Sequence, residues 1–120
     1  MAIRWYQLIV DAHDPAGLAQ WWAEVLGYSV LYQSEHEVII GSSPHRYPGI
    51  VFVPVPDVKT TKNRLHIDLD PDDYESEVSR ILDLGARRAD VGQGECSWSV
   101  LIDPEGNEFD ILRPHRSLVE

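Results

Sequence analysis

The chain has very little cysteine and no long apolar segment. Its 120 residues include one cysteine, Cys96, so no disulfide can form within the chain. No apolar run approaches the roughly 20 residues that span a bilayer, and no basic stretch followed by an apolar core indicates a signal peptide. These absences favour a protein of the reducing cytoplasm that is not inserted in a membrane.

Positive charge is scarce as well. Ten Lys and Arg residues stand against 20 Asp and Glu, and the formal net charge is −10. Nucleic acids and anionic membrane surfaces are bound through basic patches, so neither is an expected partner. Hydrophobic residues make up 43% of the chain and charged residues 25%, which is ordinary for a globular protein. A chain of this length forms one domain with its own core.

Hydrophobic patterning predicts the same order of elements twice, β-α-β-β-β. In the first half, Asp14-Pro15 begins a helix and Gly27 ends it, in the positions that N-caps and C-caps favour. In the second half, Asp70 or Asp72 caps a helix that ends at Gly85. The predicted strands cover residues 3–11, 28–33, 37–41 and 50–55, then 64–69, 87–90, 97–102 and 108–112.

The two halves read as a repeat, because Gln7 precedes Gly27 by nearly the same interval as His66 precedes Gly85. One half alone would leave an open sheet edge, so we expect the halves to pair. The predicted fold is α+β: two paired βαβββ modules in a curved, barrel-like mixed sheet, with helices outside and a concave cleft inside. Within the single domain 1–120, module one covers about 1–56, a linker 57–62, module two about 63–113, and a polar tail 114–120.

Residues 63–70 carry the densest group of chemically active side chains. Leu65, Ile67 and Leu69 alternate with polar residues, the pattern of a strand with one apolar face. The polar residues are a cation, an imidazole and two carboxylates: Arg64, His66, Asp68 and Asp70. This combination indicates a candidate site. An exposed strand face with a stray histidine is the alternative.

Several polar side chains of other strands are expected on the same inner face. Gln7 comes from the first strand, and Glu108 and Asp110 come from the last strand, where they alternate with Phe109 and Ile111. Carboxamide, imidazole and carboxylate groups are ligands for divalent metals. Without a cation, the neighbouring acids would repel one another. Either a metal ion or an internal ion pair with Arg64 could relieve that repulsion.

Lys59, Lys62 and Arg64 form a small group of cations before and within the predicted strand 64–69. They could steer an anionic substrate to the cleft. The other interpretation is a solvated linker with lysines that serve solubility.

Taken together, these motifs resemble the vicinal oxygen chelate superfamily, and within it the glyoxalase-like domain group of small bacterial proteins. The resemblance rests on the paired modules, on the helix end Val25-Leu26-Gly27-Tyr28, on the strand at 63–69, and on the hairpin Asp103-Pro104-Glu105-Gly106-Asn107-Glu108-Phe109. It covers nearly the whole chain. Activities in the superfamily include glyoxalase I isomerisation, extradiol ring cleavage, epimerisation and thiol transfer to fosfomycin, while bleomycin-resistance proteins bind a ligand without metal.

The resemblance implies a divalent metal, Zn, Ni, Mn or Fe, held by Gln7, His66 and Asp110. Asp110 stands where the family has glutamate, and Glu108 on the same face is the alternative acid. The predicted strand 50–55 contains no carboxylate, whereas metal-dependent glyoxalase I members place a further ligand there. The resemblance therefore argues against glyoxalase I activity proper.

Two functions remain as hypotheses. The first is a metal-dependent lyase, isomerase or dioxygenase that chelates vicinal oxygens of a small metabolite, with Glu108 or Asp68 as the proton-transfer group. The second is a metal-free protein that binds a small molecule or sequesters an antibiotic. In both, Trp5, Arg64 and Trp98 would contact the ligand. Superfamily members of this length also lead us to expect a homodimer.

Overall fold

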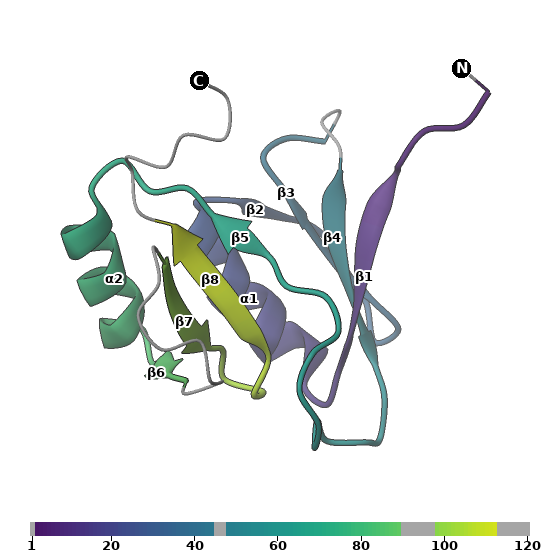
Figure 1. Cartoon of the computed structure of the whole chain (residues 1–120). Coiled ribbons are helices and arrows are strands. Elements are labelled where there is room, and N and C mark those ends of the chain that lie inside the picture. The colour runs from purple at the N-terminus through teal and green to yellow at the C-terminus, as the bar shows by residue number, and fades with distance from the viewer. Residues whose placement is uncertain (1, 45–47, 90–97, 113–120) are drawn as a thin grey trace. The chain divides into compact units, whose positions relative to one another are not determined.

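The computed structural model describes residues 2–44, 48–89 and 98–112 (Figure 1). The chain divides into two compact units, Met1–Val58 and Lys59–Glu120. The division falls inside the segment 57–62 that the sequence predicts as a linker. No helix in the described part of the chain is long and apolar enough to cross a membrane.

The first unit contains a mixed four-stranded sheet in the order β1-β4-β3-β2 (Figure 1). Strand β1 (Gln7–Ala12) runs parallel to β4 (Gly49–Pro54), and β3 (Val38–Gly41) pairs antiparallel with both β4 and β2 (Ser29–Gln33). Strand β1 begins later than predicted, at Gln7, and Ile3, Trp5 and Tyr6 before it are exposed.

Helix α1 (Pro15–Leu26) forms as the sequence predicts. The Asp14 side chain accepts a hydrogen bond from the backbone N–H of Gly17, 3.2 Å away, and Pro15 occupies the first helical position. Gly27 ends the helix with φ +68°, a left-handed conformation that glycine adopts without strain. Leu18 and Trp22 are buried in the core of this unit, so α1 is a packing element.

The second unit repeats this topology in a sheet of order β5-β8-β7-β6. Strand β5 (Asp68–Leu69) runs parallel to β8 (Glu108–Leu112), and β7 (Trp98–Ile102) pairs antiparallel with both β8 and β6 (Arg87–Arg88). In each unit the first strand therefore lies parallel to the fourth. The α+β prediction and the doubled βαβββ order are confirmed.

Helix α2 (Tyr74–Asp83) packs against β8. Its buried side chains, Tyr74, Val78 and Ile81, form a core with Phe109 and Ile111. The N-cap is Asp73, so the prediction of Asp70 or Asp72 is wrong. Asp73 makes no side-chain capping bond, and the acidic residues in the first turn, Glu75 and Glu77, interact favourably with the positive end of the helix dipole instead.

The predicted strand 64–69 is shorter than expected, since only Asp68 and Leu69 are paired. Arg64 and Leu65 lie in a bend, and Leu65 is 81% exposed. The segment before β5 is held by side-chain contacts with Glu108, described below, and the carbonyl oxygen of Ile67 accepts a backbone hydrogen bond from β8. Strand alternation therefore does not decide where Arg64 and His66 point.

A tight turn sets the pairing of β7 with β8. Asp103 is almost fully buried, and its carboxylate accepts hydrogen bonds from the backbone N–H groups of Glu105 and Asn107, each 2.9 Å away. Gly106 has φ +90°, which again favours glycine. The turn brings Glu108 opposite Ile102 and fixes where Asp110 lies along β8.

Candidate functional site

The candidate site lies where β5 and β8 pair in the second unit. Asp68 and Asp110 are register partners in this parallel pair, and the backbone N–H of Asp110 donates to the carbonyl oxygen of Ile67 at 2.9 Å. Side chains of partners in a parallel pair project to the same face of the sheet. The pairing therefore places two carboxylates side by side, on the face opposite to Phe109 and Ile111.

Asp110 is a buried acid in an unfavourable setting. The residue is 7% exposed, and its Oδ1 has no hydrogen-bond partner among the described residues. Burial, a side-chain hydrogen bond with Asp68 and the negative charge of Asp68 raise the pKa of Asp110 to about 6, although His66 and Lys62 act in the opposite direction. A buried carboxylate oxygen without a partner costs free energy. The nearby His66 and Lys62 therefore do not fully offset the burial of Asp110 and the charge of Asp68.

His66 lies between this acid and a lysine. Its Nδ1 is 3.7 Å from Asp110 Oδ2, and its Nε2 is 2.9 Å from the Nζ of Lys62. An ammonium group can only donate, so Nε2 accepts the hydrogen bond. A neutral imidazole then carries its proton on Nδ1, directed toward Asp110. His66 thus links the buried carboxylate to an exposed cation.

Glu108 holds the segment that enters the site. Its Oε1 accepts from the backbone N–H of Asn63 at 2.8 Å, and its Oε2 accepts from Lys59 Nζ at 3.2 Å. The side chain of Asn63 donates in turn to the Glu108 carbonyl oxygen at 3.2 Å. Burial raises the pKa of Glu108, but the backbone N–H groups of Asn63 and Glu108 and the Lys59 ammonium together lower it below the usual value. We call these three residues the Glu108 clasp.

The clasp bears on the choice between Glu108 and Asp110 that the sequence leaves open. Both Glu108 oxygens already accept hydrogen bonds, whereas Asp110 Oδ1 is buried and accepts none from the described residues. The geometry favours Asp110 over Glu108 as a metal ligand. Glu108 instead anchors Lys59 and Asn63 to β8. Asp68 is exposed and lies beside Asp110.

The other residues that the sequence singles out lie elsewhere. Gln7 begins β1 in the first unit, and its carbonyl oxygen accepts a hydrogen bond from the exposed Trp5 indole. That Gln7 meets His66 stays a prediction. Arg64 is exposed in its bend, and within the described ranges no carboxylate forms an ion pair with it. Trp98 begins β7, but its side chain is outside the described part of the structure.

His66 and Asp110 fit a divalent metal as two members of a ligand set. Two ligand atoms on one tetrahedral ion are roughly 3.4 Å apart, close to the 3.7 Å between Nδ1 and Oδ2, and imidazole with carboxylate suits Zn, Mn, Fe or Ni. A doubly charged ion held there would also offset the negative charge of the Asp110 carboxylate, whose Oδ1 has no hydrogen-bond partner among the described residues. Within the described residues, however, no three His, Cys, Asp or Glu side chains gather around one point, so another kind of ligand must complete the set.

Sequence reasoning gave Asn63 no role in this site. It offered Lys59 and Lys62 only as cations that could steer an anionic substrate, with a solvated linker as the other interpretation. The spacing of Lys62 and His66, four residues apart, was the available signal. The spacing alone did not predict a contact, because the bend at Arg64 and Leu65 that brings the two side chains together was not expected.

Comparison with known proteins identifies a family. The sequence model of the "Glyoxalase-like domain" matches residues 7–112. No curated protein matches the chain significantly.

Among solved structures, three similar ones carry informative names. A glyoxalase/bleomycin resistance protein/dioxygenase family enzyme from Burkholderia phytofirmans PsJN is 16% identical, with a TM-score of 0.70, over 89% of this chain and 95% of that one. Leishmania major glyoxalase I, described as trypanothione-dependent, is 15% identical, with a TM-score of 0.68, over 94% and 88%.

The third is a variant of the fosfomycin resistance protein FosX from Listeria monocytogenes, in complex with Mn(II) and 1S,2S-dihydroxypropylphosphonic acid. It is 15% identical, with a TM-score of 0.71, over 93% of this chain and 90% of that one. At such identities these likenesses establish a shared fold.

Proposed function

The chain belongs to the glyoxalase-like domain family of the vicinal oxygen chelate superfamily, and we propose that it is a divalent-metal-dependent enzyme acting on a small metabolite with vicinal oxygens. The reaction is of the lyase, isomerase or dioxygenase type. Structural neighbours named as glyoxalase I and as a Mn(II)-bound fosfomycin resistance protein support an enzymatic role and a metal.

His66 and Asp110 would hold the metal together with Gln7. When bound, the metal acts as a Lewis acid that stabilises negative charge developing on substrate oxygens. Asp68 lies beside Asp110 and is exposed, so it can exchange a proton with a ligand in the site. Glu108, the other proton-transfer candidate of the sequence, instead keeps residues 59–63 on β8.

One observation carries this proposal: Asp110 Oδ1 is buried and has no hydrogen-bond partner among the described residues. A domain that only needed stability would hold an amide or an apolar side chain there. Retaining a carboxylate next to Asp68, at the cost of a raised pKa, is understandable if a cation completes the site.

The test is the metal content of protein purified without chelator, measured by plasma mass spectrometry. We expect a near-stoichiometric divalent metal in the wild type and a loss of more than about tenfold in affinity for His66→Ala and Asp110→Asn. Glu108→Gln is the matched control and should keep the metal, because its carboxylate is committed to the clasp.

Two results would contradict this assignment. If Glu108→Gln loses the metal and Asp110→Asn keeps it, the acidic ligand is Glu108. If neither the purified protein nor protein incubated with Zn, Mn, Fe or Ni salts binds metal, the metal-free binding protein of the second hypothesis takes its place.

A further inference from the structure

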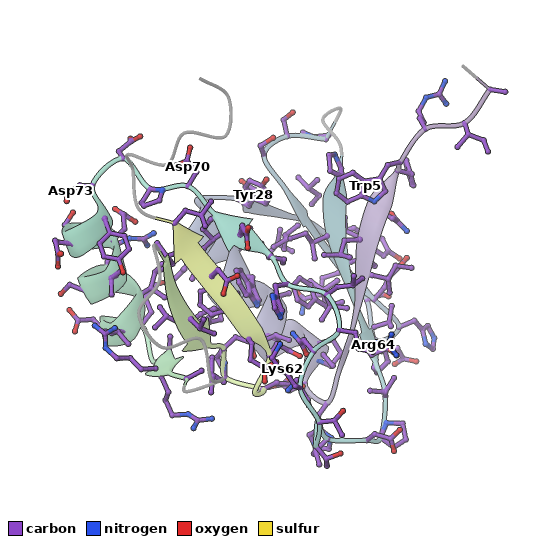
Figure 2. The ribbon with its side chains drawn as sticks, in the orientation of Figure 1. Trp5, Tyr28, Lys62, Arg64, Asp70 and Asp73 are labelled. Carbon is purple, nitrogen blue, oxygen red and sulfur yellow. The ribbon has the colours of Figure 1, made fainter. Side chains whose placement is uncertain are left out.

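Lys62 differs from the other lysine of its segment in what it contacts. Lys59 forms an ion pair with Glu108 at 3.2 Å. Lys62 instead places Nζ 2.9 Å from His66 Nε2, and within the described residues no carboxylate lies at ion-pair distance from it. Figure 2 shows Lys62 beside the start of β8. Its ammonium group is thus directed at an imidazole and not at a carboxylate.

This contact cannot coexist with a metal on His66. A neutral imidazole has one nitrogen with a free lone pair, and the other nitrogen carries a proton. The Lys62 ammonium needs a lone pair at Nε2. A metal bound at Nε2 takes that lone pair, and a metal bound at Nδ1 leaves a proton on Nε2, which then faces the ammonium. Through either nitrogen, metal binding releases Lys62.

The released ammonium stays near the site because its neighbours are anchored. Glu108 binds the side chain of Lys59 on one side of Lys62 and the backbone of Asn63 on the other. The chain is therefore attached to β8 through Lys59 on one side of Lys62 and through Asn63 on the other. The Lys62 ammonium is therefore held beside His66, and it forms no ion pair with a carboxylate of the described residues.

Charge determines what this cation can bind. Lys59 and Glu108 neutralise each other, which leaves Lys62 with the two carboxylates Asp68 and Asp110. A doubly charged metal changes the net charge of that group from negative to positive. The whole chain has a net charge of −10 and repels anions at long range, so the two positive charges of the metal favour anion binding at this position.

We propose that Lys62 binds an anionic oxygen group of the ligand, a carboxylate or a phosphonate, once a metal ion on His66 has released its ammonium group. This deepens the proposed function and rests on it. The substrate then has an anionic group next to its metal-binding oxygens. Metal and anion bind cooperatively, because the metal frees the residue that the anion needs.

The experiment measures Mn(II) affinity of the chelator-treated full chain from the free Mn(II) signal in electron paramagnetic resonance. Each protein is titrated alone, with propionate, with methylphosphonate, and with propionamide, an uncharged analogue of propionate. The variant is Lys62→Met, which cannot donate to His66. Arg88→Met is the control, since it removes the same charge from β6, at the other edge of this sheet from β5.

In the wild type, either or both anions should tighten Mn(II) binding by about 5-fold or more, and propionamide should not. The two anions distinguish a carboxylate from a phosphonate site. Without anions, Lys62→Met should bind Mn(II) about tenfold more tightly than wild type, because a competitor for the imidazole lone pair is gone. Neither anion should improve its binding further. Arg88→Met should behave as wild type.

The inference is wrong if wild type binds Mn(II) and Lys62→Met binds it no more tightly, or if an anion tightens binding equally in both. The second result would place the anion on the metal without help from Lys62. If wild type binds no divalent metal, the proposed function fails first and the role of Lys62 falls with it.

Discussion

Asp68 and Asp110 are direct neighbours across the parallel pair of β5 and β8, so two carboxylates share one face of the sheet at adjacent positions. Asp68 is exposed, whereas Asp110 is buried and its Oδ1 has no hydrogen-bond partner in the part of the chain that the structure describes. In the metal-free chain, repulsion between the two carboxylates lowers the free energy of unfolding. The free energy of unfolding should therefore respond to pH and to substitution of these residues.

Asp110→Asn should stabilise the metal-free protein at pH 7. The pKa of Asp110 is about 6 in the folded chain and 3.8 for an ordinary aspartate, so the folded state holds this proton more tightly. Stability therefore falls as pH rises from 3.8 to about 6, and the full cost is present above that window. Replacing the carboxylate should raise the free energy of unfolding at pH 7 by about 1–3 kcal/mol.

Urea denaturation in EDTA across this pH range measures the effect, and Asp57→Asn, a change at an exposed acid, is the control. A variant that is less stable than wild type at pH 7 in EDTA would show that the Asp110 charge is compensated.

Glu108→Gln should have the opposite sign. The pKa of Glu108 in the folded chain lies below its ordinary value of 4.5, so its charge stabilises the fold above that pH and ceases to do so as pH falls through the lowered pKa. We expect a loss of about 1–2 kcal/mol at pH 7, where the clasp is charged. The difference from wild type should shrink in acid.

Thermal unfolding at pH 7 and pH 4 would measure this, with Lys59→Met as the variant that removes one arm of the clasp. Equal stability of Glu108→Gln and wild type at pH 7 would mean that the clasp contributes nothing.

Asp103→Ala should be the most destabilising of the three changes. Asp103 is 1% exposed, and its carboxylate satisfies the backbone N–H groups of Glu105 and Asn107. Truncation leaves these donors without their acceptor, which should cost about 2–4 kcal/mol. Asp103→Asn keeps one acceptor oxygen and should lose less. Equilibrium urea unfolding ranks the two variants, and similar midpoints for both would contradict a hydrogen-bonding role.

Local signals explain which parts of the fold were predictable. Asp14-Pro15 and Gly27 define α1 through contacts within a few residues, and the capping bond and the positive φ are both present. The doubled topology followed from the repeat of such local patterns. The N-cap of α2 was missed because several aspartates precede that helix, and their spacing alone did not distinguish Asp73 from its neighbours.

The site was predictable only in part. Asp110 and Asp68 follow from alternation in strands that do form. Alternation does not predict three other features: the bend at Arg64 and Leu65, the contact of Lys62 with His66, and the Glu108 clasp. These contacts join residues 59–66 to one another and to β8 through side chains, and hydrophobic periodicity carries no information about them.

The register of the two sheets has a consequence for how a duplicated module diverges. Asp68 pairs with Asp110 in the second unit as Ile9 pairs with Val51 in the first, and Val51 is buried without charge. One copy has thus kept apolar residues at the positions where the other carries its acid pair. The two sheets thus keep one topology while this pair of positions changes from apolar to acidic.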